Sequence, residues 1–156
     1  EVLSIGIAVK VMTACPCTLA YSRLKTVEGL KPYLDTDMLF VKENLPPTFT
    51  HSQPGIVKAT VFSRNKPISI QTLYECIKEE AHIIESVLKR PDEHSLVEKV
   101  YRKPQFCEDL SRSIATSIAS ILSSDDLLEV EVELDESIHP HKVLAKIKSE
   151  ASKLWN

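Results

Sequence analysis

Glycine is scarce in this chain, and its scarcity excludes one class of nucleotide site. Only three of the 156 residues are glycine, so the sequence has no room for a glycine-rich loop that cradles phosphate groups. No apolar run reaches the roughly 18 residues of a membrane-spanning helix, and no secretory signal opens the chain. The net charge is −3 without a block of like charges, which argues against a general nucleic-acid surface. We therefore expect neither a membrane nor a nucleic acid as partner.

Cysteine is also limited, to four residues in two settings. Cys76 and Cys107 fall within helical patterns, where a buried free thiol is the ordinary state. Cys15 and Cys17 are too close in sequence to bridge in ordinary geometry. A disulfide framework is therefore not expected, and a reducing compartment, the cytoplasm, fits better.

The hydrophobic pattern predicts an α+β domain. Strand-like alternation covers 3–11, 56–62 and 128–134, and 143–148 is a last strand or a short helix. Helical spacing predicts a short helix at 19–30, a long one at 69–90 that begins at Ser69 and ends before Pro91, and a stretch at 95–123 in which Pro104 starts a fresh helix. Consecutive antiparallel strands with two helices on one face are the expected architecture. Residues 18–50 are otherwise read as a long loop region, which in a compact domain is usually functional or mobile.

Cys15-Pro16-Cys17 at the end of the first strand is the most unusual feature of the sequence. A thiolate at a rigid strand end is a soft ligand for zinc or iron, although the same tripeptide also suits a turn with two small buried residues. His51 precedes the second strand. A lone loop histidine is most often solvated, but beside a cysteine at the end of a paired strand it becomes a candidate ligand.

Four further candidates are acidic residues or histidines that lie at the ends of predicted helices or strands. Glu93 and Glu108 suit the first turn of a helix, where the dipole favours acids; alternatively, such a carboxylate can accept two N–H groups from the edge of a guanine. Glu136 and His139 follow a strand three residues apart, in a polar turn in which a carboxylate could orient an imidazole for proton transfer.

Taken in order, five segments resemble the type IB GTP cyclohydrolase I family and its archaeal MptA-type relatives. They are Cys15–Cys17, Thr50–Gln53, Lys89–Glu93, Lys103–Asp109 and Glu136–His141. The sequence Thr13-Ala14 before the first of them makes the archaeal branch the closer match. Two departures stand out: residues 18–50 form a longer insertion than in the bacterial form, and Pro54 stands where an arginine often follows the histidine motif. The family has a further module before the first segment, so residues 1–156 are interpreted as one catalytic module without most of it.

The resemblance implies a tunnelling fold, an antiparallel sheet with helices on one face that oligomerises into a barrel with sites between subunits. It implies Cys15, His51 and Glu93 as ligands of one divalent metal, Fe(II) first and Mn(II) or Zn(II) as alternatives. Glu108 would anchor guanine. The catalytic residues would be Glu136, His139 and Cys15. The implied partners are GTP and further copies of the chain, in a dimer or a tetramer.

The implied reaction hydrolyses GTP at C8 of guanine, releases formate and forms a dihydroneopterin phosphate, the 2′,3′-cyclic phosphate in the archaeal branch. Two rivals remain open at this point. One is another tunnelling-fold enzyme, either a pterin synthase or a nitrile reductase that uses Cys15 as nucleophile with NADPH. The other is a structural module without turnover.

Overall fold

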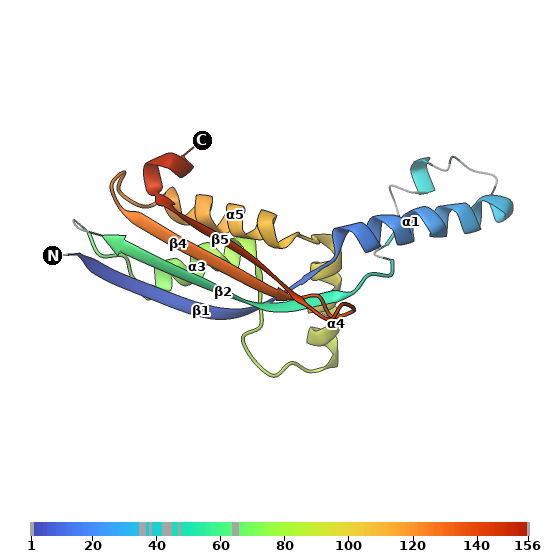
Figure 1. Ribbon diagram of the computed structural model, residues 1–156. Helices are drawn as coiled ribbons and strands as arrows, with labels where there is room; N and C mark the ends of the chain where they lie inside the picture. Colours follow the sequence, from blue (N-terminus) through green and yellow to red (C-terminus); the bar gives the residue numbers. More distant parts are fainter. Residues whose placement is uncertain are drawn as a thin grey trace.

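One antiparallel sheet organises the chain, of which the computed structural model describes residues 2–34, 37, 39–41, 45–46, 48–63 and 66–155. The strand order is β3-β1-β2-β4-β5. The strands are β1 (Leu3–Ala14), β2 (Ser52–Ser63), β3 (His82–Ile83), β4 (Leu127–Asp135) and β5 (Lys142–Glu150). Helices α3 (Ile70–Glu80) and α5 (Cys107–Ala119) cover one face of the sheet (Figure 1). The predicted α+β architecture with two helices on one face is confirmed.

The core lies between that sheet face and the two helices. Alternate residues of β4 point inward, and Leu128 and Val132 are completely buried. On α5 the inward stripe includes Leu110, Ile114 and Ile118, of which none is more than 1% exposed. The period of two in the strand and the steps of four in the helix bring these side chains to the same layer. The opposite sheet face carries charged residues, so the sheet has the inward and outward alternation of a half-covered antiparallel sheet.

Helix α1 (Pro16–Leu30) begins directly after β1 and runs away from the sheet (Figure 1). Pro16 occupies its first turn, which the fixed φ of proline favours. A helix is therefore confirmed where 19–30 predicted one, within the region that we otherwise read as loop. Leu19 is its only buried residue. Within the 18–50 region, residues 35, 36, 38, 42–44 and 47 lie outside the described part of the chain.

The prediction of one helix over 69–90 is wrong. Ser69 does cap its start, since the Ser69 hydroxyl accepts the backbone N–H of Thr72 at 3.0 Å, but α3 ends at Glu80. The next residues form β3, in which His82 and Ile83 pair with the edge of β1, and the N–H of Ile84 donates to the carbonyl of Lys10. An open strand edge offers unpaired backbone groups, and pairing with it outweighs the helical spacing of the apolar residues that continue to position 88.

The reading of Pro91 as a helix terminator is also wrong, because Pro91 lies in the first turn of helix α4 (Arg90–Arg102). The stretch predicted at 95–123 is divided between α4 and α5, with the break at Pro104 as predicted. The last segment, left open between strand and helix, is the strand β5, followed by a short 3-10 helix at Ala151–Leu154. None of the helices in the described ranges is long and apolar enough to cross a membrane.

Candidate functional site

The end of β1 and the start of β2 bring Cys15 and His51 side by side. The two strands pair along their full length up to Ala14 opposite Ser52. Just beyond that last pair, the N–H of Cys15 donates to the carbonyl of His51 at 3.2 Å, and the Thr50 hydroxyl donates to the carbonyl of Cys15 at 2.8 Å. The long segment that separates these residues in sequence therefore leaves and returns at one end of the sheet.

The two cysteines of the Cys-Pro-Cys segment have different environments. Cys15 is the N-cap of α1, and its sulfur accepts the backbone N–H of Thr18 at 3.5 Å. It is partly buried, whereas Cys17 is exposed on the helix. The alternative of a turn with two buried residues does not describe this geometry. Of the pair, Cys15 is the one fixed next to His51.

The hairpin loop between β4 and β5 covers the same end of the sheet. His51, only 9% exposed, has its ring centroid 6.3 Å from that of His139 in an edge-to-face arrangement. The Gln53 side-chain amide donates to the carboxylate of Glu136, and the backbone N–H of His139 donates to the Glu136 carbonyl. Four of the six candidate residues, Cys15, His51, Glu136 and His139, therefore converge here.

Glu108 lies in the exposed first turn of α5. The neighbouring Cys107 is buried, and its thiol donates to the Val132 carbonyl at 3.2 Å. The pKa of Cys107 is raised to about 11, chiefly by burial; the negative charges of Glu108 and Glu136 act in the same direction, and a backbone hydrogen bond at Ala145 opposes them. Glu108 and Glu136 thus both act electrostatically on this one thiol.

Glu93 is the candidate that the structure does not join to the others. It lies in the exposed first turn of α4. The other end of α4 does reach the site, because the Tyr101 hydroxyl donates to the carbonyl of Thr50 at 3.1 Å. Among the described residues, no group of three or more histidine, cysteine, aspartate or glutamate side chains is arranged to hold a metal. The assignment of Glu93 as a third ligand remains a prediction.

Three polar residues in the site were not among the sequence candidates. Gln53 contacts Glu136, Ser137 contacts His51, and the His141 ring stacks on His139 with centroids 5.4 Å apart. All three belong to the two histidine-containing segments singled out in the sequence. Their presence in those segments was the available signal, but their pairing is visible only when the β2 start and the hairpin loop meet.

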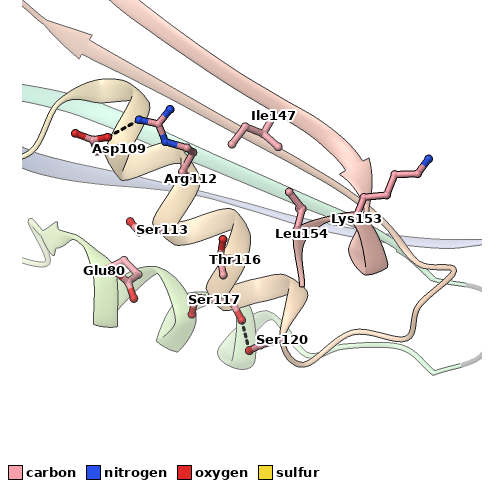
Figure 2. Close-up of a pocket in the computed structure, with 10 residues that line it drawn as sticks. All are labelled: Glu80, Asp109, Arg112, Ser113, Thr116, Ser117, Ser120, Ile147, Lys153 and Leu154. Atoms are coloured by element: carbon pink, nitrogen blue, oxygen red, sulfur yellow. Dashed lines mark hydrogen bonds and ion pairs between the residues drawn. The ribbon is translucent and has the colours of Figure 1, made fainter. Parts of the chain in front are cut away.

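A wide hollow in the described part of the surface lies away from these residues. It is a groove of about 750 Å³ over α3, α5 and the C-terminal 3-10 helix, lined by hydroxyl and charged side chains such as Thr116 and Arg112 (Figure 2). A smaller cavity of about 430 Å³ lies beside the site and is lined by Pro54, Gly55, Lys10 and Lys142 among others. Size alone therefore does not identify the candidate site, and the convergence of Cys15 and His51 is the better guide.

The sheet, the helices on its single covered face and the paired strand ends define an α+β domain of the tunnelling type. The chain belongs to the type I GTP cyclohydrolase FolE2 family, whose model matches residues 2–145. It is 36% identical over 153 residues to the GTP cyclohydrolase MptA of Thermoplasma acidophilum, covering 96% of this chain and 51% of that protein. It is 33% identical over 143 residues to the GTP cyclohydrolase FolE2 of Akkermansia muciniphila, covering 91% of this chain and 45% of that protein. The chain thus spans about half the length of the curated relatives that it matches.

Proposed function

We propose that this chain carries the catalytic residues of a metal-dependent GTP cyclohydrolase. The enzyme hydrolyses GTP at C8 of guanine, releases formate and yields a 7,8-dihydroneopterin phosphate, the 2′,3′-cyclic phosphate, in the first step of pterin biosynthesis for methanopterin or folate. The relatives' names support the reaction class. The structural observation that carries the proposal is the convergence of Cys15, His51 and the Glu136–His139 loop at one end of the sheet.

Cys15 and His51 are the residues suited to hold the metal. Sulfur and imidazole form a mixed soft and borderline donor pair that accepts Fe(II), Mn(II) or Zn(II), and their backbones are hydrogen-bonded to each other. We assign the third position to Glu93, in the order of the family segments, with Fe(II) as the first expectation. When bound, a divalent metal would supply hydroxide near neutral pH by lowering the pKa of a water molecule.

Glu108 and the hairpin loop would bind the guanine base and transfer protons. The Glu108 carboxylate accepts two N–H groups from the amidine edge of guanine, which holds C8 in one orientation and lowers the entropic cost of reaction. His139, beside the Glu136 carbonyl and against His51, moves protons as the imidazole ring of guanine opens and formate leaves. Glu136, in the same loop, orients His139 for this proton transfer.

The site is expected to be complete only between copies of the chain. On its outer side β1 pairs with another strand in the described ranges only at Val11 and Met12, and β5 ends the sheet on the other side. Open edges are usually covered or closed, and a symmetric oligomer closes them economically. We therefore propose a dimer or tetramer with GTP bound between subunits, where Glu93 of one copy could approach the Cys15 and His51 of another. Free thiols at all four cysteines agree with the cytoplasm as its compartment.

A metal and turnover assay on matched variants tests the proposal. The purified protein, loaded with Fe(II), should release formate from GTP. Cys15→Ala should lose metal and turnover, whereas Cys17→Ala, which removes the exposed neighbouring thiol, should retain both. Glu108→Gln should keep the metal and lose turnover, because an amide offers only one acceptor, whereas Asp109→Asn in the same helical turn should remain active. Metal loading without any formate release from GTP would refute the cyclohydrolase, and NADPH oxidation in its place would identify the reductase alternative.

A further inference from the structure

Ser137 connects the hairpin loop to both the ring and the neighbouring backbone of His51. It is the second residue of the loop that joins β4 to β5. Its Oγ lies 2.8 Å from the carbonyl oxygen of Ser52, to which it donates, and 3.4 Å from Nδ1 of His51. No other hydroxyl in the described part of the chain contacts both of these neighbouring residues.

Donor counting decides which atom carries the proton in the second contact. A serine hydroxyl has one hydrogen to donate and two lone pairs to accept with. The Ser52 carbonyl can only accept, so it takes that hydrogen. The Ser137 oxygen must then accept at Nδ1, which requires the proton of the neutral His51 ring to reside on Nδ1. The lone pair of the ring is therefore on Nε2.

We propose that Ser137 is a positioning residue that holds His51 in the Nδ1–H tautomer and so leaves Nε2 unprotonated. Its consequence for metal binding rests on the proposed function, in which His51 is a ligand. Metal-binding imidazoles commonly donate their second ring N–H to a partner that fixes tautomer and orientation. Ser137 supplies the partner here, although it belongs to a loop that is distant in sequence.

The backbone around His51 is also held by residues other than Ser137, so the contact specific to this hydroxyl is the one with the ring. Cys15 donates to the His51 carbonyl and Tyr101 donates to the Thr50 carbonyl. These backbone hydrogen bonds do not restrict rotation of the His51 side chain. The contact with Ser137 and the edge-to-face contact with the His139 ring both restrict that rotation.

Nitrogen NMR of the imidazole in the metal-free full-length protein tests the proposal directly. With the neutral ring, long-range proton–nitrogen correlations should show the His51 proton on Nδ1. Ser137→Ala should move the ring toward the Nε2–H form, Ser137→Thr should restore the Nδ1–H form because it retains the hydroxyl, and Ser120→Ala should change nothing. The Ser120 hydroxyl also donates to a backbone carbonyl, that of Ser117 at 2.7 Å, so this control removes the same group at a distant place.

The proposal is overturned if the wild-type ring carries its proton on Nε2, a result that needs no variant to fold. It is equally overturned if a folded Ser137→Ala protein keeps the Nδ1–H form. For the link to metal binding, Zn²⁺ affinity measured by calorimetry should fall roughly 10- to 100-fold in Ser137→Ala, and an unchanged affinity would break that link. Because the tautomer is read without GTP or metal, an expected tautomer in a protein without cyclohydrolase activity would refute the proposed function and leave this inference standing.

Discussion

Gln53 and Glu136 are hydrogen-bonded side chain to side chain although 83 residues separate them in sequence. Gln53 is only 4% exposed at the start of β2, and Glu136 is the first residue after β4. The amide hydrogen of Gln53 thus meets a carboxylate at the root of the hairpin loop. This contact fastens the loop that carries His139 to the strand that follows His51.

Removal of the amide should therefore weaken both the hairpin loop and the stability of the fold. Gln53→Leu keeps an apolar stem of similar size but leaves Glu136 without this donor, and a lost hydrogen bond to a charged group costs about 1.5–3 kcal/mol. We expect that loss in urea unfolding, and a fall in kcat for formate release that exceeds any change in KM for GTP.

Gln71→Leu provides the matched control. Gln71 also donates its side-chain amide to a glutamate, Glu75, but on the exposed surface of α3. That variant should change neither stability nor turnover measurably, because exposed polar contacts contribute little. If the two variants behave alike, the Gln53 contact has no special role in the site.

Gly55 marks a point where β2 and β4 approach too closely for a side chain. A Cβ added there would lie 2.1 Å from the Glu133 carbonyl oxygen and 2.6 Å from Cδ2 of Leu134. Since backbone cannot yield as a flexible side chain does, Gly55→Ala should force β4 away and cost about 1–3 kcal/mol or more. We expect a lower urea midpoint together with weaker activity, because β4 leads directly into the hairpin loop that carries Glu136 and His139.

Gly29→Ala tests whether that cost is steric. A Cβ at Gly29 meets nothing within 4 Å, and alanine in a helix is favoured over glycine by roughly 0.5–1 kcal/mol. The control should be neutral or slightly stabilised. A Gly55→Ala protein as stable as the control would show that the strands separate without cost.

The strands could be predicted because their alternation records burial on one face. Leu128, Val130, Val132 and Leu134 are all buried, and the glutamates between them face outward. The end of α3 could not be predicted in this way, because the apolar spacing that suggested a longer helix is local. The open edge of β1 that draws His82 and Ile83 into the sheet is created by a strand more than sixty residues earlier in the chain.

In the candidate site, too, some residues could be predicted from local sequence and others depend on distant contacts. The family segments pointed to Cys15, His51 and the Glu136–His139 pair, which the sheet does bring together. Gln53 and Ser137 act through partners that are far away in sequence, so no local pattern distinguishes them from ordinary polar residues. Glu93 is separated from the other candidates because α4 presents its first turn to the exterior, and a partner copy cannot be read from one sequence.

Burial of the Cys107 thiol predicts an alkaline loss of stability. Its pKa is raised to about 11 in the folded chain, chiefly by burial, so the folded state favours the protonated thiol. The contribution is fully present below the ordinary cysteine pKa of about 8.5 and is lost as the pH rises from there through 11, by up to about 2–3 kcal/mol. Urea unfolding between pH 7 and 11 should show this decline.

Cys107→Ala should flatten that alkaline decline while lowering stability at pH 7, because it leaves a small cavity in the core. Cys17→Ala, at an exposed position on α1, should leave the decline unchanged. Iodoacetamide should accordingly modify Cys17 in the native protein well before Cys107. Parallel curves for wild type and Cys107→Ala would contradict the assignment of the decline to this thiol.

The outward sheet face carries a ladder of paired charges, centred on Lys146, that predicts a loss of stability in acid. Lys146 Nζ lies 2.6 Å from Glu129 and 3.6 Å from Glu131, which also binds Lys58 at 2.8 Å. Hydrogen bonds from Lys146 and from Lys58 lower the pKa of Glu129 and Glu131 respectively. A lowered folded-state pKa contributes stability above the ordinary glutamate pKa of about 4.3, and that contribution is lost as the pH falls through the lower folded value.

Lys146→Gln should therefore flatten the stability profile below about pH 4.3, because both glutamates lose a cation that holds their pKa down. The measurement is urea unfolding from pH 2 to 7 at low salt, repeated in about 1 M NaCl, where screening over roughly 3 Å should shrink the difference from wild type. Lys25→Gln is the matched control, since it breaks a single exposed pair with Glu28 on α1, where Lys25 also lies over the Tyr21 ring, and single exposed pairs contribute little. The expected order is a clear flattening for Lys146→Gln and none for Lys25→Gln. Equal profiles for the two variants would mean that the ladder acts as separate surface pairs, because only a connected network makes the central lysine count for more than a peripheral one.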